Sequence, residues 1–131
     1  MKRLDEQKTT FMNAGKNIIV VDDDPSIQDA VRIMLERKGY GITIFGSGER
    51  LLIGEFDHPD LFIVDKQLPG VDGLDVCRFL KSQDATKDIP VLILSASPHA
   101  GRLAKAACAN EFLEKPFKMQ ALRDAVERLI A

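Results

Sequence analysis

Short apolar runs alternate along the chain with longer stretches in which apolar residues recur at helical spacing. The runs are continuous and rich in valine, isoleucine and leucine, which is typical of strands buried on both faces of a parallel sheet. Strands are therefore expected at residues 17–21, 42–45, 60–64, 90–94 and 111–114.

Each expected strand is followed by a helical pattern with its own boundary signals. Asp24 and Pro25 have the residue types of an N-cap and a first helical position, and Gly39 ends the helix that they open. Further helices are expected from Ser47 through Leu52, after Gly73, from Ser97 to about Ala107, and over residues 122–130.

A strand followed by a helix, five times over, predicts βαβ units and a parallel sheet with helices on both faces. The expected fold class is therefore α/β, a three-layer, doubly wound sheet of five strands. The division of the chain that we expect is one domain over residues 17–131, preceded by a flexible polar extension over residues 1–16.

Composition narrows the class of protein. Of 131 residues, 45% are apolar and 29% charged, as in ordinary soluble domains, and 18 basic against 20 acidic residues leave a net charge of only −2. A protein that binds nucleic-acid phosphates usually has a basic excess, and neither a basic stripe nor a helix-turn-helix segment is evident, so no direct nucleic-acid contact is expected.

The cysteines and the apolar runs indicate the cellular compartment in which the protein is expected. Cys77 and Cys108 lack the spacing of a disulfide framework or a zinc motif, and both are expected to be buried thiols. The apolar runs are too short for a membrane helix, and residues 1–16 lack the apolar centre of a secretory signal. A cytoplasmic protein without membrane contact is expected.

Polar side chains follow four of the expected strands at the point where each strand ends. Asp22 and Asp23 follow the first strand, Asp65 the third, Ser95 the fourth and Lys115 the fifth. Ligands of open parallel sheets bind outside the carboxyl ends of the strands, so these groups are expected to meet at one edge.

Clustered carboxylates repel one another unless a cation intervenes, and oxygen-only ligands suit Mg²⁺. A lysine and a hydroxyl at the same edge suit the oxygens of a phosphoryl group. The pattern therefore predicts a metal-assisted phosphoryl-transfer site in which a carboxylate is the acceptor.

Four segments of the chain carry the residues named above, namely VVDDDP at residues 20–25, VDKQLPGVDG at 64–73, LSA at 94–96 and EKPF at 114–117. In this order and spacing they resemble the receiver domain of bacterial two-component response regulators. The resemblance covers about residues 17–131, and it implies a flavodoxin-like fold with strand order 2-1-3-4-5.

The resemblance also implies a role for each matching residue. Asp65 would accept a phosphoryl group from a sensor histidine kinase or a histidine phosphotransfer protein. Ser95 and Lys115 would hold the phosphoryl oxygens. The implied Mg²⁺ ligands are Asp22, Asp23, Asp65 and the carbonyl of Gln67, the implied switch residues are Ser95 and Phe112, and Gln67 and Ser97 occupy positions that tune dephosphorylation.

By the same resemblance the protein is a phosphorylation-dependent signalling switch and not an enzyme that turns over a small molecule. Its only chemistry would be phosphorylation of itself from a phosphohistidine donor, followed by autodephosphorylation. The phosphorylated form would act on a downstream protein, or associate with itself, through the face made by residues 98–131. The kinase, the target and the lifetime of the phosphoryl group are left open by the sequence, as is whether the domain stands alone or belongs to a larger regulator.

Two alternatives remain. A degenerate receiver would act as a constitutive protein-binding module, although every functional group of the resemblance is present here. A phosphatase of the haloacid-dehalogenase type would use a DxDx[ST] motif, which Asp22, Asp24 and Ser26 match superficially. No acidic pair follows the strand at residues 90–94, where that family places metal ligands, so this alternative is disfavoured.

Overall fold

Five parallel strands form one sheet in the order β2-β1-β3-β4-β5 in this computed structural model, which describes residues 15–130. The order and the parallel pairing confirm the predicted fold class. All but two residues of the predicted extension, residues 1–16, lie outside the described part, as does residue 131. The strands are β1 (Asn17–Val21), β2 (Gly41–Phe45), β3 (Leu61–Asp65), β4 (Val91–Ser95) and β5 (Glu111–Glu114).

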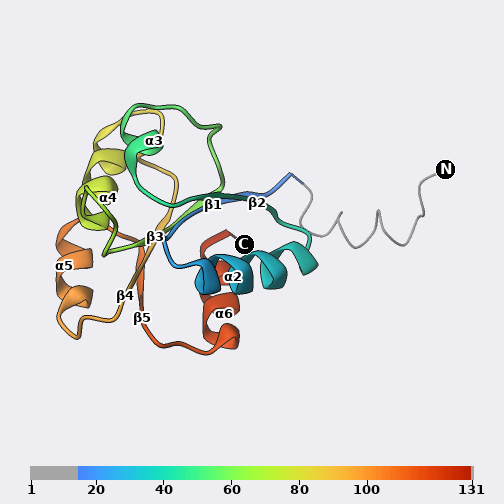
Figure 1. Cartoon of the computed structure of the whole chain (residues 1–131). Coiled ribbons are helices and arrows are strands. Elements are labelled where there is room, and N and C mark those ends of the chain that lie inside the picture. Colours follow the sequence, from blue (N-terminus) through green and yellow to red (C-terminus); the bar gives the residue numbers. More distant parts are fainter. Residues whose placement is uncertain (1–14, 131) are drawn as a thin grey trace.

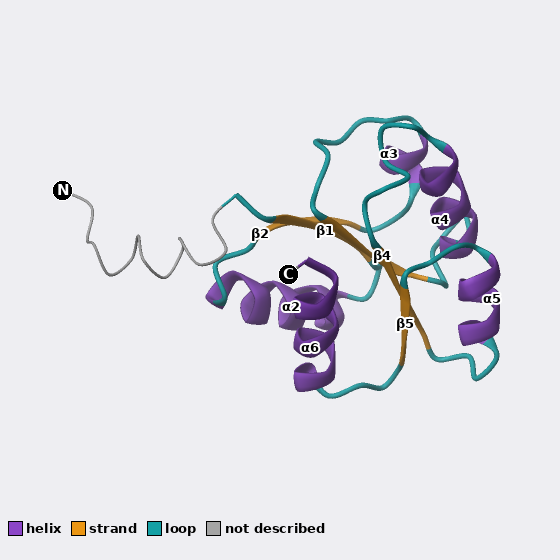
Figure 2. Cartoon of the chain, turned by 180° about the vertical axis from the view of Figure 1, so that it is seen from behind, coloured by secondary structure: helices purple, strands orange, loops and turns teal. Residues whose placement is uncertain are grey.

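Helices cover both faces of the sheet and make the three layers visible in Figures 1 and 2. Helices α2 and α6 lie on one face, and α3, α4 and α5 lie on the other. The helices are α2 (Pro25–Arg37), α3 (Glu49–Leu52), α4 (Gly73–Ser82), α5 (Ala100–Ala106) and α6 (Met119–Ile130).

The three central strands explain the continuous apolar runs of the sequence. Successive residues of a strand point to opposite faces, so a strand with helices on both sides needs apolar residues at every position. In β1, Ile19 packs toward the α4 side while Ile18 and Val20 pack toward α2 and α6. All five residues of β3 and of β4 are buried, including the polar Asp65 and Ser95 at their ends.

The predicted boundaries of α2 are confirmed. The side chain of Asp24 accepts a hydrogen bond from the Ser26 amide at 2.9 Å, and Pro25 occupies the first turn. Gly39 follows the end of the helix with a φ of +94°, in the left-handed region that favours glycine. Helix α2 is therefore bounded at both of its ends by the residue types that the sequence predicts.

Three local predictions were wrong. The N-cap of α3 is Gly48 rather than Ser47, and α5 begins at Ala100 rather than next to Ser97. The hydroxyl of Ser97 instead accepts a bond from the His99 amide at 3.4 Å, and such local bonds compete with helix formation. Cys77 is buried as expected, but Cys108 is exposed because it occupies the turn that ends α5, with a φ of +67°.

Among the described residues, no helix is long and apolar enough to span a membrane.

Candidate functional site

The carboxylates predicted to meet at the edge of the sheet do meet. Asp22 and Asp23 leave the end of β1, and Asp65 is the last residue of the neighbouring strand β3. One carboxylate oxygen from each of the three lies within 4.8 Å of the others. Asp22 is 0% exposed and Asp65 only 6%, whereas Asp23 is open to solvent. The cluster therefore has two buried members and one that an ion can reach from outside.

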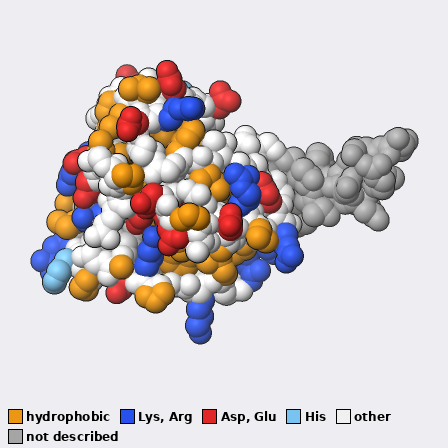
Figure 3. Space-filling model, viewed as in Figure 1, with side chains coloured by type: hydrophobic (Ala, Val, Ile, Leu, Met, Phe, Trp, Pro, Cys, Tyr) orange, Lys and Arg blue, Asp and Glu red, His pale blue; other side chains and the backbone are white. Residues whose placement is uncertain are grey.

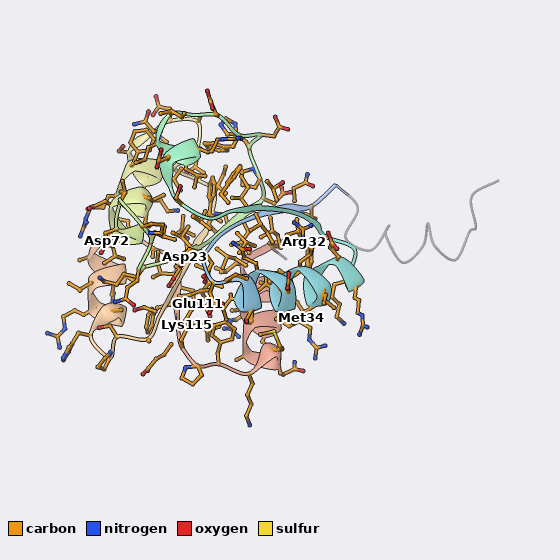
Figure 4. All side chains as sticks on the ribbon, viewed as in Figure 1. Asp23, Arg32, Met34, Asp72, Glu111 and Lys115 are labelled. Carbon is orange, nitrogen blue, oxygen red and sulfur yellow. The ribbon has the colours of Figure 1, made fainter. Side chains whose placement is uncertain are left out.

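Lys115 brings a positive charge into this cluster from the far end of the chain. Its ammonium nitrogen lies 3.0 Å from Oδ2 of Asp22 and 3.5 Å from Oδ1 of Asp65. Its backbone amide donates to the Ser95 carbonyl at 2.8 Å, which ties the end of β5 to the end of β4. In Figure 4 the labelled side chains of Asp23 and Lys115 both lie in the central region at this edge.

The negative charge of the Asp65 carboxylate is only partly compensated by the groups around it. Burial raises the pKa of the Asp65 carboxyl, and the charge of Asp22 raises it further, although Lys115 and the Gln67 amide act in the opposite direction. Burial works to lower the pKa of Lys115, but its hydrogen bond and attraction to Asp22, together with Asp65, raise it overall. Lys115 thus stays charged while the carboxylates still carry an excess of negative charge.

This donor set fits a magnesium ion. Three carboxylates that converge without nitrogen or sulfur ligands are hard oxygen donors, which Mg²⁺ accepts together with water. A divalent cation would also relieve the repulsion that raises the pKa of Asp65. The chain therefore provides both a place for the ion and an energetic reason to bind it.

The other predicted residues lie around this cluster with roles that remain predictions. The Gln67 backbone bonds the Asp65 carboxylate, while its side chain is exposed. The hydroxyl of Ser95 is buried and accepts a bond from the Ser97 amide at 3.0 Å. Phe112 lies in β5, two positions before the residue paired with Ser95, and packs against the core on the α5 side.

Two features of the loop after Asp65 were missed by the sequence analysis. Lys66 forms an ion pair at 3.0 Å with Asp72, whose other oxygen caps α4 by accepting from the Leu74 amide at 2.7 Å. Gly73 approaches the strand so closely that a Cβ there would lie 2.0 Å from the Asp65 carbonyl oxygen. A glycine beside an aspartate in a turn gives no signal of this approach, because the contact depends on how the loop closes.

Replacing Gly73 by alanine is expected to destabilise the protein by about 2 kcal/mol, because the added methyl group overlaps the backbone of Asp65. Urea unfolding measures the loss. Gly46→Ala is the matched control, since nothing lies within 4 Å of a Cβ there, and it is expected to change stability by less than about 0.5 kcal/mol. Equal stabilities of the two variants would contradict the close approach.

The sheet order, together with carboxylates and a lysine at its carboxyl edge, defines a flavodoxin-like α/β domain with a ligand site at that edge. The chain belongs to the response regulator receiver domain family, whose model matches residues 18–127. It is thus a receiver domain of the two-component type, as the sequence analysis predicted.

Solved structures of receiver domains agree with this assignment. A putative response regulator from Chloroflexus aurantiacus superposes with a TM-score of 0.82 at 31% identity, over 88% of this chain and 97% of that one. The receiver domain of a Pseudomonas aeruginosa sensor histidine kinase superposes with a TM-score of 0.80 at 30% identity, over 89% and 98%. That structure is described as having a magnesium ion coordinated in its active-site cleft.

Curated relatives are longer proteins. The DNA-binding response regulator MtrA of Mycolicibacterium smegmatis is 34% identical over 110 residues, which are 82% of this chain and 47% of that protein. The regulator RpaA of Synechocystis is 36% identical over 117 residues, 86% of this chain and 48% of that protein. The chain therefore spans about half the length of these relatives.

The description of these relatives as DNA-binding stands against the expectation of no nucleic-acid contact. This chain spans only about half of those proteins, so for the chain itself the expectation stays a prediction. In the face shown in Figure 3, lysine and arginine side chains are interspersed with acidic ones rather than gathered into a stripe.

Proposed function

We propose that this receiver domain is a phosphorylation switch that accepts a phosphoryl group on Asp65. The observation that carries the proposal is the position of the Lys115 ammonium, 3.0 Å from Asp22 and 3.5 Å from Asp65, beside three clustered carboxylates. A phosphoryl group that arrives at Asp65 would find a cation on one side and a metal-binding pair of carboxylates on the other.

The transfer is a displacement at phosphorus. A carboxylate oxygen of Asp65 attacks the phosphorus of a phosphohistidine, the P–N bond breaks, and its electron pair stays on the imidazole, which takes up a proton. The product is an aspartyl phosphate, and attack by water returns the carboxylate and releases inorganic phosphate. Lys115 stabilises the equatorial oxygens, because its charge is already held at that place.

Asp22 is poorly placed to make this attack. Both side-chain oxygens of Asp22 are engaged, Oδ1 by the Asp24 amide at 2.9 Å and Oδ2 by Lys115 at 3.0 Å. This supports the receiver chemistry over the dehalogenase-type alternative, in which Asp22 would be the nucleophile.

Magnesium is the cation proposed for the site, held by Asp22, Asp23, Asp65 and the carbonyl of Gln67. When bound, it would neutralise charge that develops on the phosphoryl oxygens. Asp23 is the member of the set that is open to solvent, and we assign it the most direct contact with the ion. Asp22, which is already bonded to Lys115, would act mainly through water.

The switch itself couples the site to the neighbouring face. In the proposed series of movements, the Ser95 hydroxyl first turns toward the phosphoryl group. The ring of Phe112 then moves into the space that the hydroxyl leaves, and the surface made by residues 98–131 changes its packing. Ser95 is buried and Phe112 half-buried, so each has room to move only together with its neighbours. We assign the tuning of dephosphorylation to Gln67, whose backbone bonds the Asp65 carboxylate, and to Ser97, whose amide donates to the Ser95 hydroxyl.

A protein donor has a place to dock beside the site. A hollow of about 350 Å³ is lined by Asp24, Ile27, Ala96, Lys115, Pro116, Phe117 and Met119, most of them apolar. Because Lys115 belongs to both the hollow and the acidic cluster, a helix bearing a phosphohistidine could pack there while its imidazole reaches Asp65. We therefore propose a sensor histidine kinase or a histidine phosphotransfer protein as donor, and a protein target or a second copy of the chain as the partner of residues 98–131.

The deciding experiment exposes the purified protein to acetyl phosphate with and without Mg²⁺. Intact mass is expected to rise by one phosphoryl group only with the metal, and peptide mapping after reduction of the acyl phosphate is expected to place it on Asp65. Asp65→Asn should stay unlabelled. A label on Asp22 with bulk release of phosphate would favour the hydrolase, and no label on the folded wild type would favour the constitutive binding module.

A further inference from the structure

Asp22 is held at every polar atom it has. Its amide donates to the Phe45 carbonyl at 3.1 Å, and its two carboxylate oxygens accept from the Asp24 amide and from Lys115. Its carbonyl oxygen accepts from Nε2 of Gln28 at 2.6 Å. Gln28 is thus the only residue of α2 among these partners, and it acts on the backbone rather than on the carboxylate.

The hydrogen bond from Gln28 to Asp22 also affects the position of Asp23. The carbonyl of Asp22 and the amide of Asp23 belong to one rigid peptide plane, so an oxygen held in place also sets the direction in which the chain continues to Asp23. Asp23 is exposed, and its carboxylate is the member of the acidic cluster that faces solvent. Without the bond, this plane could rotate and carry the Asp23 side chain away from Asp65.

Gln28 itself is anchored by the helix. Its amide donates to the Asp24 carbonyl at 2.9 Å as the first full turn of α2 closes, and its half-buried side chain reaches back past that turn to Asp22. A side chain fixed on a helix provides a more precise support than one on a loop. The donor therefore stands at a defined place relative to the metal-binding pair.

We infer that Gln28 is a positioning residue for the metal site, which orients Asp23 toward the cation through the carbonyl of Asp22. The inference rests on the proposed function, in which Asp22, Asp23 and Asp65 bind Mg²⁺. Groups that orient the ligands of a metal commonly change its affinity when they are removed, even though they do not touch the ion.

The test compares Mg²⁺ binding by Gln28→Met and wild type, measured by titration calorimetry on the folded protein. Methionine keeps the length and helix propensity of glutamine but has no donor, and the dissociation constant is expected to rise about tenfold. Gln28→Ala, the best helix former, provides a second variant and should show the same loss. Gln120→Met is the matched control, because Gln120 is also a helical glutamine whose Nε2 donates to an oxygen, that of Asp124 at 2.8 Å, away from the cluster.

Thermal unfolding in EDTA separates positioning from mere stabilisation. A lower melting temperature with an unchanged Mg²⁺ affinity in both Gln28 variants would overturn the inference, whereas a weaker affinity in both variants supports it. Asp23→Asn reports on the proposed site itself and should lose the metal. If wild type and Asp23→Asn bound Mg²⁺ equally, the proposed metal site would fail instead, and the two failures are thereby distinguished.

Discussion

Lys115→Met is expected to slow phosphorylation of Asp65 by acetyl phosphate about a hundredfold, the cost typical of losing one preorganised donor at a transition state. The ammonium is the group that links Asp22 and Asp65, at 3.0 and 3.5 Å, and methionine retains the length of its stem without the charge. The rate is measured by the increase in intact mass with time at saturating Mg²⁺.

The same substitution is expected to lower the free energy of unfolding at neutral pH by about 3 kcal/mol, because Asp22 is 0% exposed and would lose its buried ion pair with Lys115. Lys118→Met, three residues later and exposed, serves as the control and should leave both rate and stability nearly unchanged. A phosphorylation rate within threefold of wild type would remove Lys115 from the mechanism.

Asp65→Asn is expected to be unable to accept the phosphoryl group and, at pH 7 in EDTA, to be more stable than wild type. Burial and the charge of Asp22 raise the pKa of the Asp65 carboxyl above its ordinary value of 3.8, so the native state binds this proton more tightly than the unfolded state does. Native stability from this group therefore falls as the pH rises past 3.8, and the ionised form is the costly one. Asparagine removes that cost, for a gain of about 1 kcal/mol, or about 4 °C in melting temperature.

The sign of this effect can be checked in two ways. The advantage of Asp65→Asn should shrink as the pH falls through the raised pKa of the Asp65 carboxyl toward 3.8, because the native carboxyl is then protonated, and it should also shrink at saturating Mg²⁺. Asp75→Asn is the control, because Asp75 lies on α4 in an exposed pair with Arg78. An Asp65→Asn variant that melts below wild type at pH 7 would show that Asp65 stabilises the fold.

The fold could be predicted because its signals are local and repeated. Strand β3 is an unbroken apolar run that ends in a polar residue, and α2 has a capping aspartate, a proline and a terminal glycine in sequence order. The start of α5 could not be predicted in the same way. Ser97 has the residue type of an N-cap, but its hydroxyl bonds the His99 amide in a turn that the sequence does not distinguish from a helix start.

Some residues of the candidate site could likewise be predicted from the sequence, and others could not. Asp22, Asp65 and Lys115 could be predicted because the topology alone brings strand ends together. Gln28 could not, since it is one of several polar residues on α2 and its contact with Asp22 depends on a rotamer. The close approach of Gly73 to Asp65 could not be predicted either, because it depends on how the loop closes.

The exposed Cys108 offers a ready attachment point for a spectroscopic probe. Its thiol stands at the turn between α5 and β5, within the surface assigned to the switch, whereas burial raises the pKa of Cys77 to about 11 and shields that thiol from alkylation. A maleimide fluorophore should therefore label the native protein at a single position. Movement of α5 relative to β5 could then be followed in real time, without engineering a cysteine into the chain.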